Sequence, residues 1–299
     1  MRLAVPVLSM AAATTPSVTN RAGMPPMMYG TAWKKERTAS LVTEAIKAGF
    51  TGIDTACQPK HYKEEGVGEA VSSLIEKGII KRGDIFIQTK YTPIRGQDPK
   101  NIPYDPSKPL ATQVAQSFAR SQQNLRTDYV DSLVLHSPLP TIEETLTVWR
   151  EFEKLHASRC ALRLGISNCY DPSFFRELYE GAATKPTVLQ NRFYGDTGHD
   201  VELRAFCAEK GIAYQSFWTL TANKEALRSR ELKAIAAAHP GATPECVLYC
   251  ALMQRGVTPL SGTCDAAHMA QDVAAMRGAF ELSEDEVETI FRVVLSGRG

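Results

Sequence analysis

Short apolar runs rich in β-branched residues alternate along this chain with longer segments whose apolar residues recur at helical spacing. Eight of the runs are short enough to be buried strands. They cover residues 27–29, 52–54, 85–90, 130–136, 162–167, 187–191, 213–217 and 257–260. Strands that alternate with helices pair in parallel, and about eight such units close into a cylinder. The pattern therefore predicts an α/β fold, a single (β/α)8 TIM barrel.

The segments between the runs carry helical faces and helix start signals. Leu41, Ala45 and Ala48 share one face, and Val67, Val71 and Leu74 share another. Further helices are expected at 110–125, 141–156, 172–179, 201–210, 244–254, 266–280 and 284–296, with an extra helix at 223–239 after the seventh strand. Asp171-Pro172 and Thr243-Pro244 each place a capping residue before a first-turn proline.

The start of the chain differs from the rest. Residues 1–35 contain no Asp or Glu, and Arg2 precedes a mildly apolar run, as in a weak targeting segment. Residues 19–25 look like the turn of a hairpin that precedes the first barrel strand. We therefore expect residues 1–14 to be an N-terminal extension, either disordered or used for targeting, and residues 15–299 to form one barrel domain.

Composition narrows the function classes. The net charge of +1, with 22% charged residues, gives no general attraction for nucleic acid or acidic membranes. No apolar run approaches the roughly 20 residues that a membrane-spanning helix needs. The seven cysteines are scattered and contain no CxxC pair, which suggests reduced thiols, a cytoplasmic location and no zinc ribbon.

The main rival architecture is an open, doubly wound sheet that binds a dinucleotide. Its GxGxxG fingerprint is absent, because Gly66-Val67-Gly68 lacks both the third glycine and the preceding strand. A phosphate loop of the GxxxxGK[ST] type is also absent. No two histidines or carboxylates share a recognisable ligand spacing, so we expect no metal site.

Three of the apolar runs each end in an ionisable residue: Asp54, Lys90 and His136, with Tyr62 shortly after Asp54. In a barrel the carboxyl ends of all strands meet at one rim, where active sites lie. Reduction of a carbonyl needs a proton donor, and a phenol with a pKa of about 10 is a weak one unless its anion is stabilised. Lys90 would lower that pKa, Asp54 would hold the lysine charged, and His136 would bind the substrate oxygen.

Each of these residues has a plainer interpretation when it is taken alone. Lys90 is then a solvated strand end, Asp54 a turn or helix cap, and His136 a structural histidine. Lys90 on a barrel strand could also form a Schiff base, as an aldolase lysine does. The four residues together favour a catalytic site. Asp54 and Tyr62, with the carboxamide-like set Ser167, Asn168 and Gln190, fit hydride transfer better than a Schiff base.

The motifs resemble the aldo-keto reductase family. The residues concerned are Gly52 to Ala56, Tyr62 to Gly68, Gln88-Thr89-Lys90, Leu133 to His136, Leu164 to Asn168 and Gln190, after an opening of Met24-Pro25-Pro26 and Gly30 to Trp33. The resemblance covers about residues 19–280 and implies reduction of aldehydes or ketones by NADPH, with Tyr62 as proton donor. His61 occupies the register in which many relatives have the tyrosine, so the loop is expected to be one residue shorter. A cofactor-binding regulatory subunit with little turnover is the alternative within the family.

The resemblance also implies a cofactor site. Ser167, Asn168 and Gln190 would orient the nicotinamide, and Phe217 would stack on its ring. The other expected cofactor contacts are Gly30, Thr31, Asp54, Trp218, Thr219, Leu220, Ser261, Gly262, Thr263, His268, Gln271 and Asp272. Leu260 stands where many relatives have a lysine for the phosphate of NADP. NADPH is expected on family grounds, and NADH stays open.

Aromatic residues near the proposed site suggest the substrate class. Trp33, Tyr91 and Trp218, with Tyr62 and His136, would line an apolar pocket that favours aromatic or aliphatic aldehydes and ketones. Each of the three could equally be a core residue. We expect a monomer whose only partner is a small carbonyl substrate.

Overall fold

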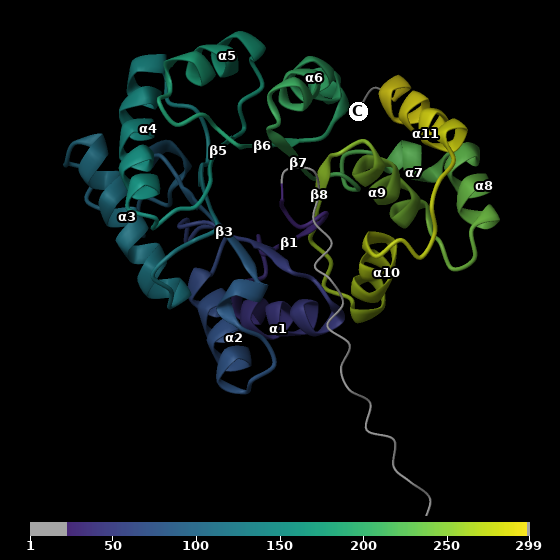
Figure 1. The fold of residues 1–299 in the computed structure, drawn as a ribbon, viewed down its shortest axis with the longest axis horizontal. Helices are drawn as coiled ribbons and strands as arrows, with labels where there is room; N and C mark the ends of the chain where they lie inside the picture. The colour runs from purple at the N-terminus through teal and green to yellow at the C-terminus, as the bar shows by residue number, and fades with distance from the viewer. Residues whose placement is uncertain (1–22, 298–299) are drawn as a thin grey trace, which may run out of the picture.

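The computed structural model describes residues 23–297, and a closed barrel of eight parallel strands forms its centre (Figure 1). Its strands are β1 (Met28–Gly30), β2 (Gly52–Asp54), β3 (Phe86–Tyr91), β4 (Ser132–Leu135), β5 (Leu164–Ser167), β6 (Val188–Arg192), β7 (Ala213–Phe217) and β8 (Thr258–Ser261). Each strand pairs with the next, and β8 returns to β1 through the pair Met28 and Leu260. The predicted (β/α)8 barrel is confirmed.

Helices surround the strands, as the view onto the ring in Figure 1 shows, and eight of them form most of the outer ring. They are α1 (Thr38–Ala48), α2 (Glu64–Glu76), α3 (Leu110–Leu125), α4 (Ile142–Ala157), α5 (Pro172–Gly181), α6 (Val201–Lys210), α9 (Pro244–Gln254) and α10 (Ala266–Met276). The two predicted caps are present: Asp171 accepts from the amides of Ser173 and Phe174, and Thr243 accepts from the amide of Cys246. The helices thus cover most of the outer face of the barrel.

Three further helices lie together beside α9: α7 (Lys224–Arg228), α8 (Arg230–Ala238) and α11 (Glu284–Ser296). The single helix expected at 223–239 is wrong, because the chain turns extended at Ser229 (ψ 155°). The Ser229 hydroxyl accepts from the amide of Leu232 and starts a new helix there, as a good N-cap residue does. Similarly, α10 ends at Met276 and not at residue 280, since Gly278 takes a left-handed φ of 75°.

Short 3-10 helices complete the described chain: η1 (Lys35–Arg37), η2 (Arg82–Asp84), η3 (Ile94–Gly96) and η4 (Gly195–Asp200). The expected extension at 1–14 and most of the expected hairpin turn at 19–25 lie outside residues 23–297. Between residues 23 and 297 no helix is long and apolar enough to cross a membrane.

Candidate active site

A cavity of about 980 Å³ opens at the carboxyl-terminal rim of the barrel, between the strand ends and the loops that follow them. This volume is at the upper end of the ~300–1,000 Å³ common for small-molecule sites. Most of the residues singled out from the sequence line it: Gly30, Trp33, Asp54, Tyr62, His136, Ser167, Asn168, Gln190, Phe217, Trp218, Thr219, Leu220, Ser261, Gly262, Thr263, His268, Gln271 and Asp272. Residues that are up to 240 positions apart in the chain therefore meet at one cavity.

Three of the expected residues do not line this cavity. Lys90 is fully buried behind Asp54. The Thr31 hydroxyl donates to the backbone carbonyl of Asp54 at 2.8 Å, so its side chain supports β2 instead of facing the cavity. The placement of Tyr91 in the substrate pocket is wrong: its ring packs on Tyr104 in the core, because β3 turns that side chain outward toward the helices.

Asp54 and Lys90 form a buried ion pair at the inner end of the cavity. The Lys90 Nζ lies 2.6 Å from Asp54 Oδ2 and also donates to the carbonyl of Thr55 at 2.9 Å. Both side chains are at most 2% exposed. Burial lowers the pKa of Lys90, and the carboxylate of Asp54 opposes this effect.

A ring of glutamines completes the hydrogen bonding of the same carboxylate. Asp54 Oδ1 accepts from the side-chain amides of Gln88 (2.8 Å) and Gln190 (2.9 Å). Both amides also donate to Gln215 Oε1, at 2.7 and 2.8 Å respectively. Every member points into the barrel from alternate positions of β2, β3, β6 and β7. The carboxylate is therefore held in one orientation by partners on β3 and β6, and Gln215 on β7 bonds both glutamines in turn.

Tyr62 lies over this pair. Lys90 Nζ is 5.2 Å from the centre of the Tyr62 ring, and the ring of His136 meets it edge-on at 5.9 Å between centres. Burial raises the pKa of Tyr62, and the charge of Asp54 raises it further. The expectation that Lys90 lowers this pKa is wrong for the structure as it stands, because the ammonium is directed at Asp54 and Thr55 and desolvation dominates.

His61, which holds the register of the tyrosine in many relatives, lies to one side. Its ring stacks on Trp33 with 3.9 Å between ring centres. The turn before α2 thus brings the Tyr62 ring, and not the His61 ring, next to Lys90 and His136.

His136 is held by a single side-chain partner. Its Nδ1 lies 2.7 Å from the hydroxyl of Thr92, which follows β3. Burial lowers the pKa of His136 well below its ordinary value, and Lys90 lowers it further. The imidazole is therefore neutral at neutral pH.

The side chains at the ends of β5 and β6 leave a specific set of hydrogen-bonding groups unused. Asn168 Nδ2 donates to the His136 carbonyl and to Ser167 Oγ, and Gln190 Nε2 donates to Asp54 and Gln215. The Ser167 hydroxyl proton and the Gln190 carbonyl oxygen therefore stay available toward the cavity. One donor and one acceptor side by side match a carboxamide, so this donor set fits the nicotinamide group.

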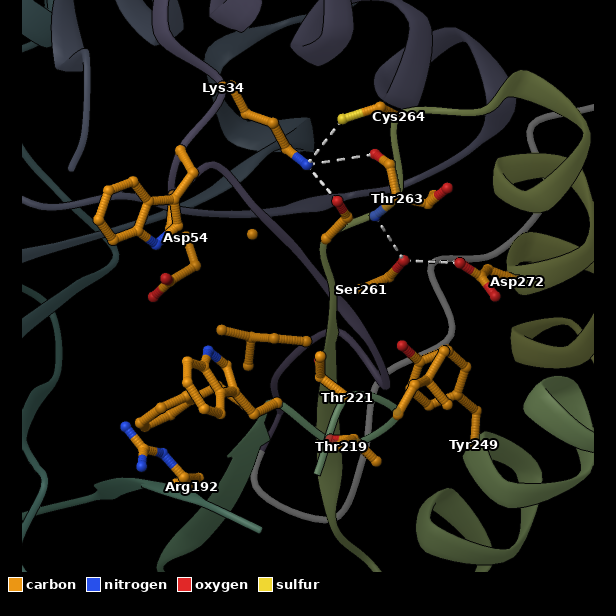
Figure 2. A pocket seen from close by; sticks show the side chains of 18 of the residues that line it. Lys34, Asp54, Arg192, Thr219, Thr221, Tyr249, Ser261, Thr263, Cys264 and Asp272 are labelled. Atoms are coloured by element: carbon orange, nitrogen blue, oxygen red, sulfur yellow. Dashed lines mark hydrogen bonds between the residues drawn. The ribbon is translucent and has the colours of Figure 1, made fainter. Parts of the chain in front are cut away.

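The far end of the cavity lies over β8 and α10. Ser261 donates to Asp272 at 2.6 Å, and Lys34 reaches across to the carbonyls of Gly262 and Thr263 and to the sulfur of Cys264 (Figure 2). Burial raises the pKa of Asp272 to about 6. An adenosine portion at this end would meet hydroxyls and backbone amides, a carboxylate and a lysine whose Nζ is already bonded.

Three residues at the rim have left-handed backbone angles: Trp33 (φ 64°), Asn168 (φ 53°) and Trp218 (φ 57°). Each directly follows, or comes shortly after, the end of a barrel strand. Such angles are rare for bulky residues and are found mostly at functional sites. All three of these residues line the cavity.

Comparison with known proteins identifies the family. The model of the aldo/keto reductase family matches residues 26–294. The chain belongs to that family. A Candida tropicalis protein named NAD(P)H-dependent D-xylose reductase I,II is 27% identical over 322 residues, covering 94% of this chain and 93% of the relative. The glyoxal reductase of Bacillus subtilis is 28% identical over 249 residues, covering 83% and 80% of the two chains.

A solved structure supports the same assignment. The aldo/keto reductase from Brucella melitensis superposes with a TM-score of 0.76 at 26% identity, over 94% of this chain and the whole of that one. The reductases among the relatives support carbonyl reduction with a nicotinamide cofactor as the general chemistry of this chain.

Sequence reasoning missed three charged residues that line the cavity of this aldo/keto reductase: Lys34, Arg192 and Glu245. Arg192 stands two positions after Gln190 on the same strand, and strand alternation alone could have placed both on one side. Glu245 lies in the first turn of α9 and reaches the cavity through tertiary packing, which no local pattern signals. Within residues 23–297 no group of three or more His, Cys, Asp or Glu side chains is placed to hold a metal ion.

Proposed function

We propose that this protein reduces aldehydes and ketones to alcohols, with a bound reduced nicotinamide dinucleotide and with Tyr62 as the proton donor. The observation that carries the proposal is the convergence of Tyr62, His136 and the Asp54–Lys90 pair on one cavity that also presents a carboxamide-binding set. The dinucleotide supplies the hydride when it is bound. The side chains of this chain must then polarise the carbonyl, deliver a proton and accept the resulting charge.

Tyr62 is suited to that proton transfer. Burial and Asp54 raise its pKa, so the phenol is protonated at neutral pH, and transfer of its proton to the carbonyl oxygen depends on stabilisation of the phenolate that is left. The phenolate that remains would lie near the Lys90 ammonium, which Asp54 keeps in place. A neutral His136 that accepts the Thr92 proton at Nδ1 carries its own proton on Nε2 and can donate it to the same oxygen.

The cofactor proposal is that NADH and NADPH bind with affinities within tenfold of each other. Family resemblance favours NADPH, but the lining over β8 offers no free lysine or arginine: Leu260 replaces the lysine, and Lys34 is bonded to backbone carbonyls. His268 is the remaining cationic candidate there, whereas Asp272 and Glu245 would repel a 2′-phosphate and accept from a 2′-hydroxyl.

We also propose that residues 15–299 act as one domain and that the protein works as a monomer. The supporting argument is that Asp54, Tyr62, His136 and the carboxamide-binding set lie on one barrel, so the proposed chemistry needs no residue from a second copy. Gel filtration with light scattering should give a mass near 32.9 kDa. A stable dimer would contradict this part of the proposal.

The decisive experiment is the Tyr62→Phe variant. Absorbance of the reduced nicotinamide is followed with 4-nitrobenzaldehyde as substrate, and turnover should fall by about 10²-fold or more. Cofactor affinity, measured by tryptophan fluorescence quenching, should stay within twofold. Tyr129→Phe, at a ring that packs on Arg82 away from the cavity, is the matched control.

His61→Ala tests the alternative register in the same assay. It should lose stacking on Trp33 and keep most of the turnover. Normal turnover in Tyr62→Phe together with loss in His61→Ala would overturn the assignment of the donor.

A further inference from the structure

Arg192 brings an unpaired positive charge to the cavity. It is the last residue of β6, and Gln190, two positions earlier, points into the barrel toward Asp54. Side chains alternate along a strand, so Arg192 projects on the same side, one step above Gln190 at the rim. It lines the cavity with Phe217 and Trp218.

The surroundings of the guanidinium are mainly aromatic. Its central carbon lies 4.0 Å from the centre of the Trp218 ring, 5.1 Å from that of Tyr194 and 5.9 Å from that of Phe217. The Nε atom is buried and has no hydrogen-bond partner. In the described part of the chain, residues 23–297, Arg192 forms no ion pair.

Such an arrangement is costly for a protein that binds nothing there. A guanidinium taken partly out of water loses hydration, and contact with aromatic faces recovers only part of that loss. The planar fork of arginine matches carboxylate and phosphate oxygens, and such charged hydrogen bonds are the stronger ones. An anionic group entering the cavity would supply the missing partner.

The two lysines at or near the cavity already have hydrogen-bonding partners. Lys90 is paired with Asp54, and Lys34 is bonded to backbone carbonyls and Cys264. Figure 2 shows Arg192 well apart from Lys34 and Cys264, on the side of the cavity formed by β6 and β7. Arg192 is therefore a separate positive centre of this cavity. Its backbone amide donates to the hydroxyl of Tyr170, which donates to the side chain of Asn168, so the end of β6 is tied to the end of β5.

We propose that Arg192 is an anion-binding residue of this cavity and takes a carboxylate or phosphate oxygen of a ligand. The proposal deepens the proposed function and rests on it for the nature of the ligands. Two sources offer the same chemistry: the carboxylate of an acidic carbonyl substrate, such as a formyl acid, or a phosphate of the dinucleotide. If the substrate is the source, the pocket that was expected to be apolar also takes a charged group.

The substrate arm of the test compares two aldehydes that differ in charge alone, 4-formylbenzoate and 4-formylbenzamide. If the substrate carboxylate binds Arg192, Arg192→Gln should raise KM for 4-formylbenzoate about tenfold or more and leave KM for the amide within twofold. Arg192→Lys should recover part of the loss, because it keeps the charge without the fork.

The cofactor arm measures binding without turnover. NADH is titrated into each variant, and quenching of tryptophan fluorescence gives the dissociation constant; Trp218, in contact with Arg192, lies at the site. If a phosphate of the dinucleotide is the partner, Arg192→Gln should raise that constant about tenfold or more and should weaken its dependence on salt. In that case Arg192→Gln should change KM for 4-formylbenzoate and KM for 4-formylbenzamide by the same factor.

Arg120→Gln, on the exposed face of α3, is the matched control and should change neither quantity. Thermal unfolding of each variant checks that the fold is kept. The proposal is overturned if Arg192→Gln folds normally and leaves both KM values and the NADH dissociation constant within twofold of the unmodified protein. If the protein reduces neither aldehyde, the proposed function fails, and titration of NADH and of 4-formylbenzoate by fluorescence still decides whether Arg192 binds anions.

Discussion

Lys90 Nζ lies 2.6 Å from Asp54 Oδ2, and the other oxygen of that carboxylate accepts hydrogen bonds from Gln88 and Gln190. The pair is buried at the floor of the cavity, below Tyr62. Neither charge can be removed alone without leaving the other desolvated. The contact that holds the Lys90 ammonium below the phenol therefore cannot be broken at one partner without destabilising the barrel.

The first prediction concerns this pair. Lys90→Met should lower the free energy of unfolding by about 3–5 kcal/mol, because Asp54 is left as a buried charge without its cation. The double variant Lys90→Met with Asp54→Asn should recover much of that loss, since an amide can still bond the two glutamines. Urea denaturation followed by circular dichroism measures both. A double variant less stable than Lys90→Met would contradict the argument.

The second prediction concerns pH and Asp272, which is 5% exposed. Burial raises its pKa from 3.8 to about 6, so the folded protein binds the proton more tightly than the unfolded chain. The stability that Asp272 contributes is therefore full below about pH 4 and is lost as pH rises through about 6. At higher pH the ionised carboxylate destabilises the fold by up to about 3 kcal/mol.

Asp272→Asn keeps an acceptor for Ser261 and removes the charge. The variant should exceed the original protein in unfolding free energy by about 1–3 kcal/mol at pH 8, and the difference should shrink toward zero at pH 4. Chemical denaturation at several pH values measures it. A difference that is constant with pH would show that Asp272 does not titrate in this range.

The third prediction concerns the choice between NADPH and NADH. Leu260, at the end of β8, lines the part of the cavity where the adenosine portion is proposed to bind. Leu260→Lys should raise affinity for NADPH about tenfold or more, because an ammonium would pair with the 2′-phosphate, and should leave NADH affinity within about threefold. Fluorescence titration of both cofactors measures the ratio.

Leu260→Met is the control for changes in packing and should leave the ratio unaltered. Equal gains for NADH and NADPH in the lysine variant would place the new charge near another phosphate. No gain for either would mean that the adenosine portion binds elsewhere.

The alternation of short apolar runs with helical faces was enough to predict the barrel. The bounds of Gly52–Asp54 and Ala213–Phe217 agree with β2 and β7. Threonines flank the first run on both sides, whereas Ile212 and Trp218 flank the second. The strand predicted at 130–136 is shorter in the structure, where β4 covers only Ser132–Leu135. Val130 forms an isolated bridge to Ala161 outside that strand. Val130 is apolar but lies outside the paired residues of β4. The bounds of a strand therefore depend on hydrogen bonding to its neighbours as well as on apolar character.

In the candidate site, too, the sequence could place some residues and not others. Asp54, Tyr62 and His136 could be placed together from their positions after parallel strands, since that topology brings strand ends to one rim. Tyr91 could not be assigned correctly, because one residue of strand alternation decides between cavity and core. The direction of the Tyr62 pKa shift also required coordinates, since it depends on burial and on where the Lys90 ammonium points.

The sequence by itself determined the architecture and the chemical type of the site, because hydrophobic periodicity and the identity of strand-end residues are local properties. Only the tertiary structure decided which charges share the cavity. Arg192, Lys34 and Glu245 come from β6, the loop after β1 and the start of α9, and their meeting depends on how distant elements pack. Electrostatic and desolvation energies depend on distance in space, which the order of residues along the chain does not give.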